Sequence, residues 1–215
     1  MLPEEPPEIT IPKTAPVMVL EQATLFPNCL MPLFVFEPRF RLMLNHALET
    51  DRLLCIGTVR PDSPVDAEVE DVHATSTAAL VRACVTHDDG TSHIVLQGIQ
   101  RVTFNAWPQI KPFRIAEISP LDVEDDAVYQ NPAKQLASDL IDLTAKATGE
   151  DGKINPMLHE HLRGISDPGA IADVVAHLVI HDPEQRQEML ECTSPIERLH
   201  ELIQLLQKAI AGQSG

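Results

Sequence analysis

The sequence predicts an α+β fold in which a β-barrel or sandwich is followed by a bundle of helices. Short apolar runs of strand length recur in the first half of the chain. An Asp-Gly turn joins two of these runs, which is a strong hairpin signal. Helical periodicity replaces the strand pattern after Pro120. So many strands in so short a stretch favour an antiparallel barrel or sandwich. We therefore expect one domain over residues 1–118 and a helical one over residues 119–215.

Residues 25–48, LFPNCLMPLFVFEPRFRLMLNHAL, join a strand to a helix. Residues 30–36 form an apolar run of strand length, and Pro32 within it favours an edge position or a bulge. Glu37-Pro38 ends that strand and starts a helix, because proline fits the first helical position. Its apolar residues follow at helical spacing: Phe40, Met43, Leu44, Ala47 and Leu48. We interpret the segment as a buried strand followed by an amphipathic helix.

The other strands are predicted from apolar runs and turn residues. They cover residues 17–20, 53–59, 79–86, 92–98 and 113–118, with Arg101–Phe104 as a continuation after Gly98. Asp89-Gly90 lies between the third and fourth of these runs and predicts a tight hairpin. Residues 60–71 hold two prolines and five acidic residues, which is typical of a solvated loop.

Proline and capping residues mark the helix starts in the second half. Pro132 precedes a stripe of Leu136, Leu140, Leu143 and Ala147, and both Asp167-Pro168 and Asp182-Pro183 are N-cap signals. Residues 194–197, Ser-Pro-Ile-Glu, form a capping box. The last helix has an apolar stripe of Ile196, Leu199, Ile203, Leu206 and Ile210. Packing within the chain is favoured for it, and a homodimer seam is the alternative.

Composition narrows the classes of partner. The 215 residues include 32 acidic and 16 basic ones, for a net charge of −16. This charge weighs against nucleic acid and anionic membranes. The four cysteines form no CxxC pair, the N-terminal residues do not resemble a signal peptide, and no apolar run could span a bilayer. These features predict a cytoplasmic protein.

No motif for catalysis or for a cofactor stands out. The chain has neither a GxxxxGK[ST] phosphate loop nor a GxSxG elbow. His87 and His93 flank the hairpin tip and could face each other across the strands, although a surface role is favoured over a metal or catalytic pair. His177 and His181 are four residues apart, and capping or surface roles are favoured for them too. We expect no enzyme, no cofactor and no metal.

Four residues are the candidates for a binding surface. Glu37 and Arg39 could frame a cleft where strand meets helix, although a structural role is favoured for them. Trp107 and Phe113 lie beside Pro108 and Pro112. Aromatic side chains next to irregular backbone often line binding grooves.

The order of these elements, with their residues, resembles the N-terminal substrate-binding domain of the ATP-dependent protease Lon. The similarity runs from about residue 17 to residue 210. The matching segments are 25–27, 33–40, 77–81, 95–102, 165–168, 172–173, 187–191 and 197–199.

The resemblance implies a PUA-like β pseudo-barrel with one or two helices, followed by a helical bundle. It also implies a non-catalytic role in capturing unfolded or apolar polypeptide. The chain is similar to the stand-alone Lon-type domains of many bacteria, which lack the ATPase and protease domains. The alternatives are an RNA-binding PUA-like domain, which the charge opposes, and a small metal-dependent hydrolase using His87 and His93.

Overall fold

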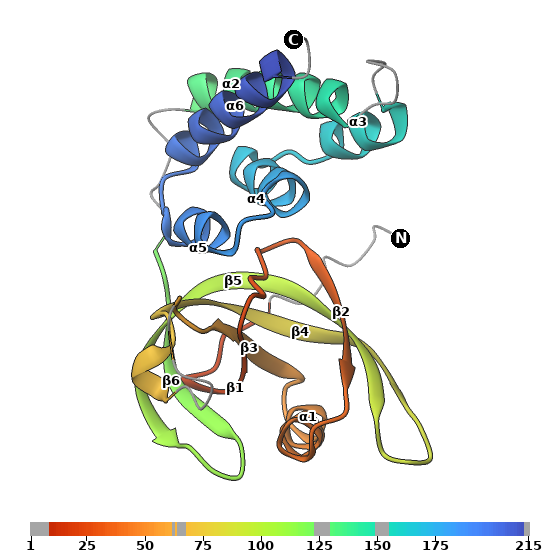
Figure 1. The fold of residues 1–215 in the computed structure, drawn as a ribbon, viewed down its shortest axis with the longest axis vertical. Coiled ribbons are helices and arrows are strands. Elements are labelled where there is room, and N and C mark those ends of the chain that lie inside the picture. Colours follow the sequence, from red (N-terminus) through yellow and green to blue (C-terminus); the bar gives the residue numbers. More distant parts are fainter. Residues whose placement is uncertain (1–8, 62, 64–67, 123–129, 149–154, 213–215) are drawn as a thin grey trace, which may run out of the picture. The chain divides into compact units, whose positions relative to one another are not determined.

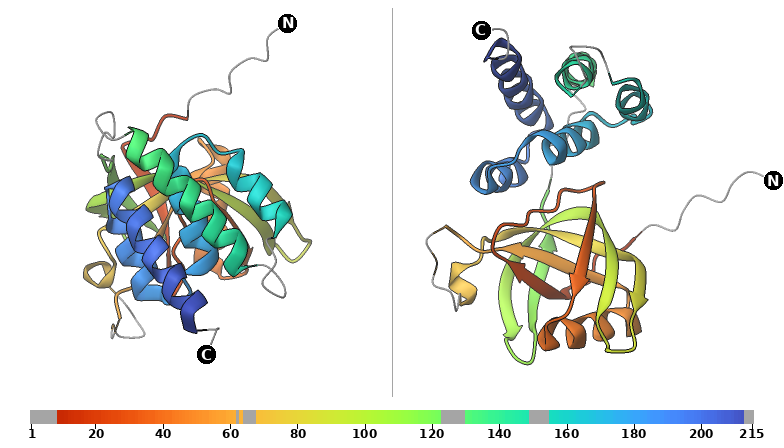
Figure 2. Two further views of the ribbon diagram at one scale, coloured as in Figure 1. Left: turned by 90° about the horizontal axis from the view of Figure 1, so that it is seen from above. Right: turned by 45° about the vertical axis from the view of Figure 1, so that its right-hand side comes forward.

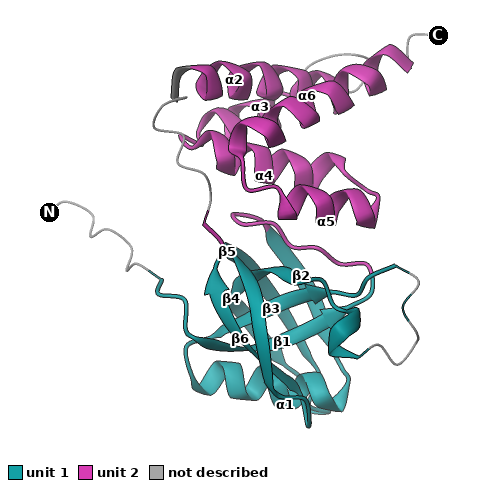
Figure 3. Ribbon diagram, turned by 90° about the vertical axis from the view of Figure 1, so that its left-hand side faces the viewer, with its two compact units in different colours: residues 1–21, 30–120 teal, residues 22–29, 121–215 magenta. Residues whose placement is uncertain are grey.

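The protein divides into two compact units in a computed structural model, which describes residues 9–61, 63, 68–122, 130–148 and 155–212. Unit 1 comprises residues 1–21 and 30–120, and unit 2 comprises residues 22–29 and 121–215 (Figure 3). The short segment 22–29 therefore leaves the strand region and groups with the helices. The predicted α+β class, a near-barrel followed by helices, is confirmed.

Six strands form a mixed sheet in the described part of unit 1 (Figure 1). They are β1 (Thr14–Leu20), β2 (Leu30–Val35), β3 (Leu53–Thr58), β4 (Thr75–Thr86), β5 (Ser92–Gln109) and β6 (Arg114–Pro120). Their order is β2-β5-β4-β3-β1-β6, and β5 also pairs with β6. The long strand β5 thus closes the barrel, pairing with β2 along its first part and with β6 along its second. Strand β2 lies outside this ring, at an edge.

One strand pairing differs from the antiparallel arrangement that the sequence predicted. Strands β1 and β3 are parallel, with Val17 opposite Cys55, whereas the other named strand pairs are antiparallel. The chain leaves β1, forms β2 and helix α1 (Pro38–Glu49), and returns to lie beside β1 in the same direction. A connection of this length allows parallel pairing, which a short hairpin loop does not.

Small and aliphatic side chains fill the barrel. Its buried cluster consists of Ala15, Val17, Cys55, Ala78, Val102, Ala116 and Ile118. Helix α1 buries Phe40, Met43, Leu44 and Ala47 of the predicted apolar side, while Leu48 is half-buried. The region predicted as a loop contains a short 3-10 helix, η1 (Val69–Asp71).

Unit 2 is helical wherever regular structure is described. Its helices are α2 (Gln130–Ala147), α3 (Pro156–Arg163), α4 (Pro168–Val179), α5 (Pro183–Glu191) and α6 (Pro195–Gly212). Helices α2 and α6 pack side by side and both contact α4 (Figures 1 and 2). Helix α3 was not predicted.

The predicted N-caps hold the helix starts in place. The carboxylate of Asp167 accepts hydrogen bonds from two backbone N–H groups of α4, and that of Asp182 accepts one from Gln185. The Ser194 hydroxyl lies 3.5 Å from the backbone nitrogen of Glu197. These bonds satisfy donors that the first turn of a helix leaves without partners. The sequence therefore located three helix starts through their caps.

The stripe of α6 packs inside unit 2. Of the predicted stripe, Leu199 and Leu206 are buried and Ile196, Ile203 and Ile210 are half-buried, on a helix that contacts α2 and α4. Leu202 is buried as well. A homodimer seam on this helix stays a prediction. On α2 the buried face is displaced from the predicted one: Ala133, Ala137, Ile141 and Thr144 are buried with Leu140, and Leu136 is only half-buried.

Segment 22–29 is held by side chains of the helical unit. The guanidinium of Arg186 donates to the carbonyl of Thr24 at 2.8 Å and lies 5.3 Å from the centre of the Phe26 ring. The Cys29 thiol lies 3.6 Å from the carbonyl oxygen of Asp173. Leu25 and Phe26 are almost fully buried. These contacts make the segment part of the core of unit 2.

Candidate functional site

An exposed apolar surface covers the outer side of β2, β5 and β4. We call it the apolar face and define it by its exposed side chains Leu30, Phe34, Phe36 and Val85. Cross-strand pairing brings these residues together, because Phe34 lies opposite His93, which in turn lies opposite Val85. The ring of Phe36 stacks on that of Phe34 with centroids 5.9 Å apart. Between 50% and 61% of each of the four residues is exposed.

The apolar face arises because β2 is apolar on both of its sides. Its inward residues Met31, Leu33 and Val35 are half-buried or buried, while Leu30, Pro32 and Phe34 point outward and are exposed. Antiparallel sheets with one solvated side usually carry polar residues on that side. The sequence predicted a buried strand here, and that interpretation was wrong for Phe34 and Phe36. Alternate side chains of a strand point to opposite faces of the sheet, so Leu30, Pro32 and Phe34 point away from the barrel interior and stay exposed to solvent.

Polar residues adjoin the apolar face and also lie within it. Beside Leu30, which pairs with Gln97, the guanidinium of Arg82 on β4 donates to the side-chain oxygen of Gln97 on β5. His93 lies between Phe34 and Val85, with its ring centroid 4.7 Å from that of Phe34. His93 in turn contacts His87. Protein-binding surfaces combine apolar and polar side chains in this way.

Glu37 and Arg39 contact each other at the start of α1. The Arg39 guanidinium forms a 2.9 Å ion pair with the Glu37 carboxylate, and both side chains are exposed. The same guanidinium lies 4.5 Å from the centre of the Phe40 ring. Glu37 occupies the N-cap of α1 without a side-chain hydrogen bond to the helix. An exposed pair of this kind contributes little to stability.

Trp107 and Phe113 make separate contacts. Trp107 is half-buried, lies 4.9 Å from the ring of Phe104 and packs against the barrel cluster. Phe113 is also half-buried and lies 5.5 Å from the ring of His46 on α1. A role of Glu37, Arg39, Trp107 and Phe113 in binding stays a prediction.

The histidine pairs of the sequence behave differently from each other. His87 and His93 do meet, with Nε2 of the first 2.9 Å from Nδ1 of the second. His177 accepts a hydrogen bond from Arg186 at 3.0 Å, whereas His181 lies beyond the end of α4. Burial, with the Arg186 charge, lowers the pKa of His177. Across the described residues, no group of three or more His, Cys, Asp or Glu side chains is arranged to hold a metal ion.

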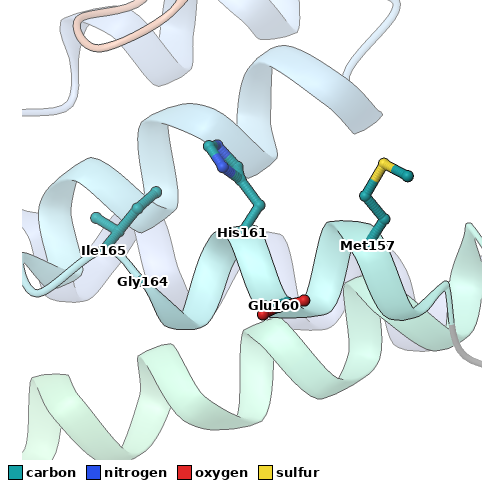
Figure 4. Close-up of a pocket in the computed structure, with 5 residues that line it drawn as sticks. All are labelled: Met157, Glu160, His161, Gly164 and Ile165. Atoms are coloured by element: carbon teal, nitrogen blue, oxygen red, sulfur yellow. The ribbon is translucent and has the colours of Figure 1, made fainter.

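An open concavity lies along α3, as Figure 4 shows. Its lining residues are Met157, Glu160, His161, Gly164 and Ile165. Met157, His161 and Ile165 project on the same side, and Met157 is 81% exposed. Nothing in this set combines a nucleophile with a base, so it offers a shallow, partly apolar surface rather than a reactive site.

The Cys55 thiol is not placed for chemistry. None of the four cysteines is in a disulfide, and Cys55 is fully buried in the barrel. Burial raises the pKa of Cys55 to about 12. Its reactive thiolate form is therefore negligible at neutral pH.

A family model of the substrate-binding domain of the ATP-dependent protease La (Lon) matches residues 14–208. The chain belongs to this family. Membership implies a substrate-binding role, and the match corresponds to the N-terminal domain of Lon rather than to its ATPase or protease domains. The resemblance of the sequence to the N-terminal domain of Lon is thereby confirmed.

Curated Lon proteases share this domain at low identity. The chain is 26% identical over 199 residues to the Lon protease of Trichlorobacter lovleyi, covering 93% of this chain and 24% of that protein. It is 28% identical over 192 residues to the Lon protease of Xanthomonas oryzae pv. oryzae, covering 89% and 22%. The chain thus spans about a quarter of the length of the relatives it matches.

Two solved structures have the same fold. The N-terminal domain of the Mycobacterium avium complex Lon protease superposes with a TM-score of 0.70 at 18% identity, covering 91% of this chain and 98% of that one. A Lon N-terminal domain protein from Xanthomonas campestris gives a TM-score of 0.63 at 18% identity, covering 88% and 96%. None of the helices described for the Lon-family chain is both long and apolar enough to cross a bilayer.

Proposed function

We propose that this Lon-family domain binds apolar segments of polypeptide, of the kind that unfolded proteins expose, on the apolar face of β2, β5 and β4. The observation that carries the proposal is the composition of β2. Each outward-facing residue of this edge strand is apolar, and Leu30 and Phe34 are at least half exposed. Contiguous exposed apolar surface of this kind marks interaction sites.

The number of exposed groups sets the strength of binding that the surface can supply. Full burial of a large apolar side chain is worth about 1.5–3 kcal/mol. Leu30, Phe34, Phe36 and Val85 are about half exposed, so covering each contributes roughly 1 kcal/mol. The total, on the order of 4 kcal/mol, is a gross gain, and the loss of translational and rotational freedom on association offsets much of it, so binding through these four side chains is weak. Weak, nonspecific contact suits transient capture of many sequences.

The apolar face also favours side-chain contact over strand addition. An edge strand can add an extended peptide through its outer backbone groups. Pro32 lies in the middle of β2, and proline has no backbone N–H to donate. Proline on an edge strand is a feature that hinders such pairing. Binding through the side chains of the face needs no backbone donor at this position.

Aggregation of a chemically denatured client, followed by light scattering, tests the proposal. Phe34→Ser combined with Phe36→Ser removes the stacked rings from the face, and the expected result is loss of most of the suppression of aggregation. Leu42→Ser is the matched control, since Leu42 is also 50% exposed but lies on α1. Circular dichroism checks that both variants are folded. If the double variant then suppresses aggregation of the client as well as the control does, the apolar face is excluded as the binding surface.

A further inference from the structure

One imidazole ring lies within the apolar face. His93 on β5 pairs with Phe34 of β2 on one side and with Val85 of β4 on the other. Side chains directly opposite each other share one face of a sheet, so all three point the same way. The His93 ring lies against the Phe34 ring, with centroids 4.7 Å apart, and all three residues are exposed. A polypeptide segment that covers both Phe34 and Val85 therefore covers His93 as well.

A second histidine makes His93 part of a hydrogen-bonded pair. Nε2 of His87 lies 2.9 Å from Nδ1 of His93, and the two rings are nearly perpendicular, at 89°. One of these two nitrogens donates its N–H, and the other accepts with a lone pair, which only a neutral imidazole has. When both rings are protonated, two N–H groups point at each other. The contact therefore persists only while at least one of the two rings is neutral.

The other charged groups near the pair lie at the hairpin turn. Asp88 and Asp89 follow His87 in the chain, and the Arg41 guanidinium of α1 lies against the turn. Hydrogen bonds from the backbone N–H and the hydroxyl of Thr91, with smaller contributions from the charges of His87 and Arg41, lower the pKa of Asp89. Strand β2 contributes no charged side chain. Histidine is the side-chain type in this set that ordinarily changes its charge between pH 5 and 8.

We propose that His87 and His93 make binding of apolar segments by this face dependent on pH, an inference that rests on the function proposed above. At neutral pH the hydrogen-bonded pair holds the His93 ring against Phe34 as part of the apolar face. As the pH falls through the histidine range, both rings take up protons and their hydrogen bond breaks. A charge then stands between Phe34 and Val85. An apolar segment would have to remove this charge from water without supplying a partner, which is unfavourable.

Proton linkage gives the sign and the size of the effect. The complex forms with the neutral His93 ring, so protonation of the free protein competes with binding. One proton that must be released on binding lowers the affinity by up to tenfold for each unit of pH below the histidine range. Between pH 7.5 and pH 5.5 we therefore expect a loss of affinity of roughly 10-fold.

An NMR titration of the complete chain with a short peptide tests the inference. The peptide contains leucine, phenylalanine and serine and is acetylated and amidated, so that it has no ionisable group and any pH dependence comes from the protein. His93→Gln keeps a polar side chain that does not titrate, and this variant should bind the peptide equally at pH 7.5 and pH 5.5. His200→Gln is the matched control, since His200 is exposed on α6, and it should keep the full loss of affinity in acid.

A second measurement needs neither a variant nor a peptide. Nuclear Overhauser contacts between the ring protons of His87 and His93 should be present at pH 7.5 and lost at pH 5.5. Ring contacts that persist at pH 5.5 would overturn the inference, and so would a peptide affinity that is the same at both pH values or an equal loss of affinity in His93→Gln. Absence of peptide binding at pH 7.5 would instead overturn the proposed function and this inference with it. The two failures are therefore distinguishable.

Discussion

The buried ion pair of unit 2 yields a prediction with a large expected effect. Arg198 of α6 donates from Nη1 to Oδ1 of Asp173 on α4 at 2.8 Å, and their side chains are only 2% and 4% exposed. Asp173→Ala leaves the guanidinium buried without its counter-charge. Breaking a buried pair in this way costs about 3–5 kcal/mol. With a urea slope of about 1–3 kcal/mol/M, the unfolding midpoint should fall by roughly 1–5 M.

Replacement of both partners separates the charge effect from simple loss of packing. The double variant Asp173→Leu/Arg198→Met removes both charges and keeps apolar volume, and such replacements are often neutral. We expect it to be more stable than Asp173→Ala despite carrying two substitutions. Asp139→Ala, at an exposed position of α2, is the control and should change stability by less than about 0.5 kcal/mol.

Two optical signals allow the units to be followed separately. Circular dichroism at 222 nm reports mainly the helices of unit 2, while Trp107, the single tryptophan of the sequence, lies in unit 1. The loss of stability should therefore be visible in the dichroism signal. A cost below about 1 kcal/mol for Asp173→Ala, or a double variant that is less stable than the single one, would refute the reasoning.

Three further predictions concern a histidine, a glycine and a cysteine. The pKa of His177 is lowered, so the folded state resists protonation of this ring. The free energy of unfolding should therefore be constant above pH 6.5, the ordinary histidine pKa, and should fall as the pH drops below 6.5. His177→Gln should flatten this pH dependence in urea unfolding. Gly90→Ala should destabilise unit 1 by about 1–2 kcal/mol or more, because φ at this position is +78° and an added Cβ would meet the Arg41 guanidinium. An unchanged urea midpoint, followed by tryptophan fluorescence, would contradict this. Cys55 is buried and has a pKa of about 12, so it should react with a thiol reagent at pH 8 only as fast as the protein unfolds. Labelling of Cys55 that is faster than unfolding, located by peptide mapping, would contradict this prediction.

Local signals in the sequence were sufficient for most helix starts and for the hairpin. Asp167 and Asp182 cap helices because short side chains with an acceptor, followed by proline, favour that geometry wherever they occur. Asp89-Gly90 makes a turn because glycine accepts a positive φ. These choices depend on neighbours in the chain, so the sequence alone determined them. It also indicated that His87 and His93 could meet, because they flank that turn.

Only the tertiary structure decided which apolar residues are covered. Phe34 and Phe36 belong to an apolar run typical of a core strand, and the pairing of β2 with β5 decides which residues of this run point outward into solvent. The parallel pairing of β1 with β3 and the packing of residues 22–29 against the helices also depend on contacts between distant segments. Hydrophobic burial has no direction, and a local pattern therefore shows that a residue is apolar but not what covers it.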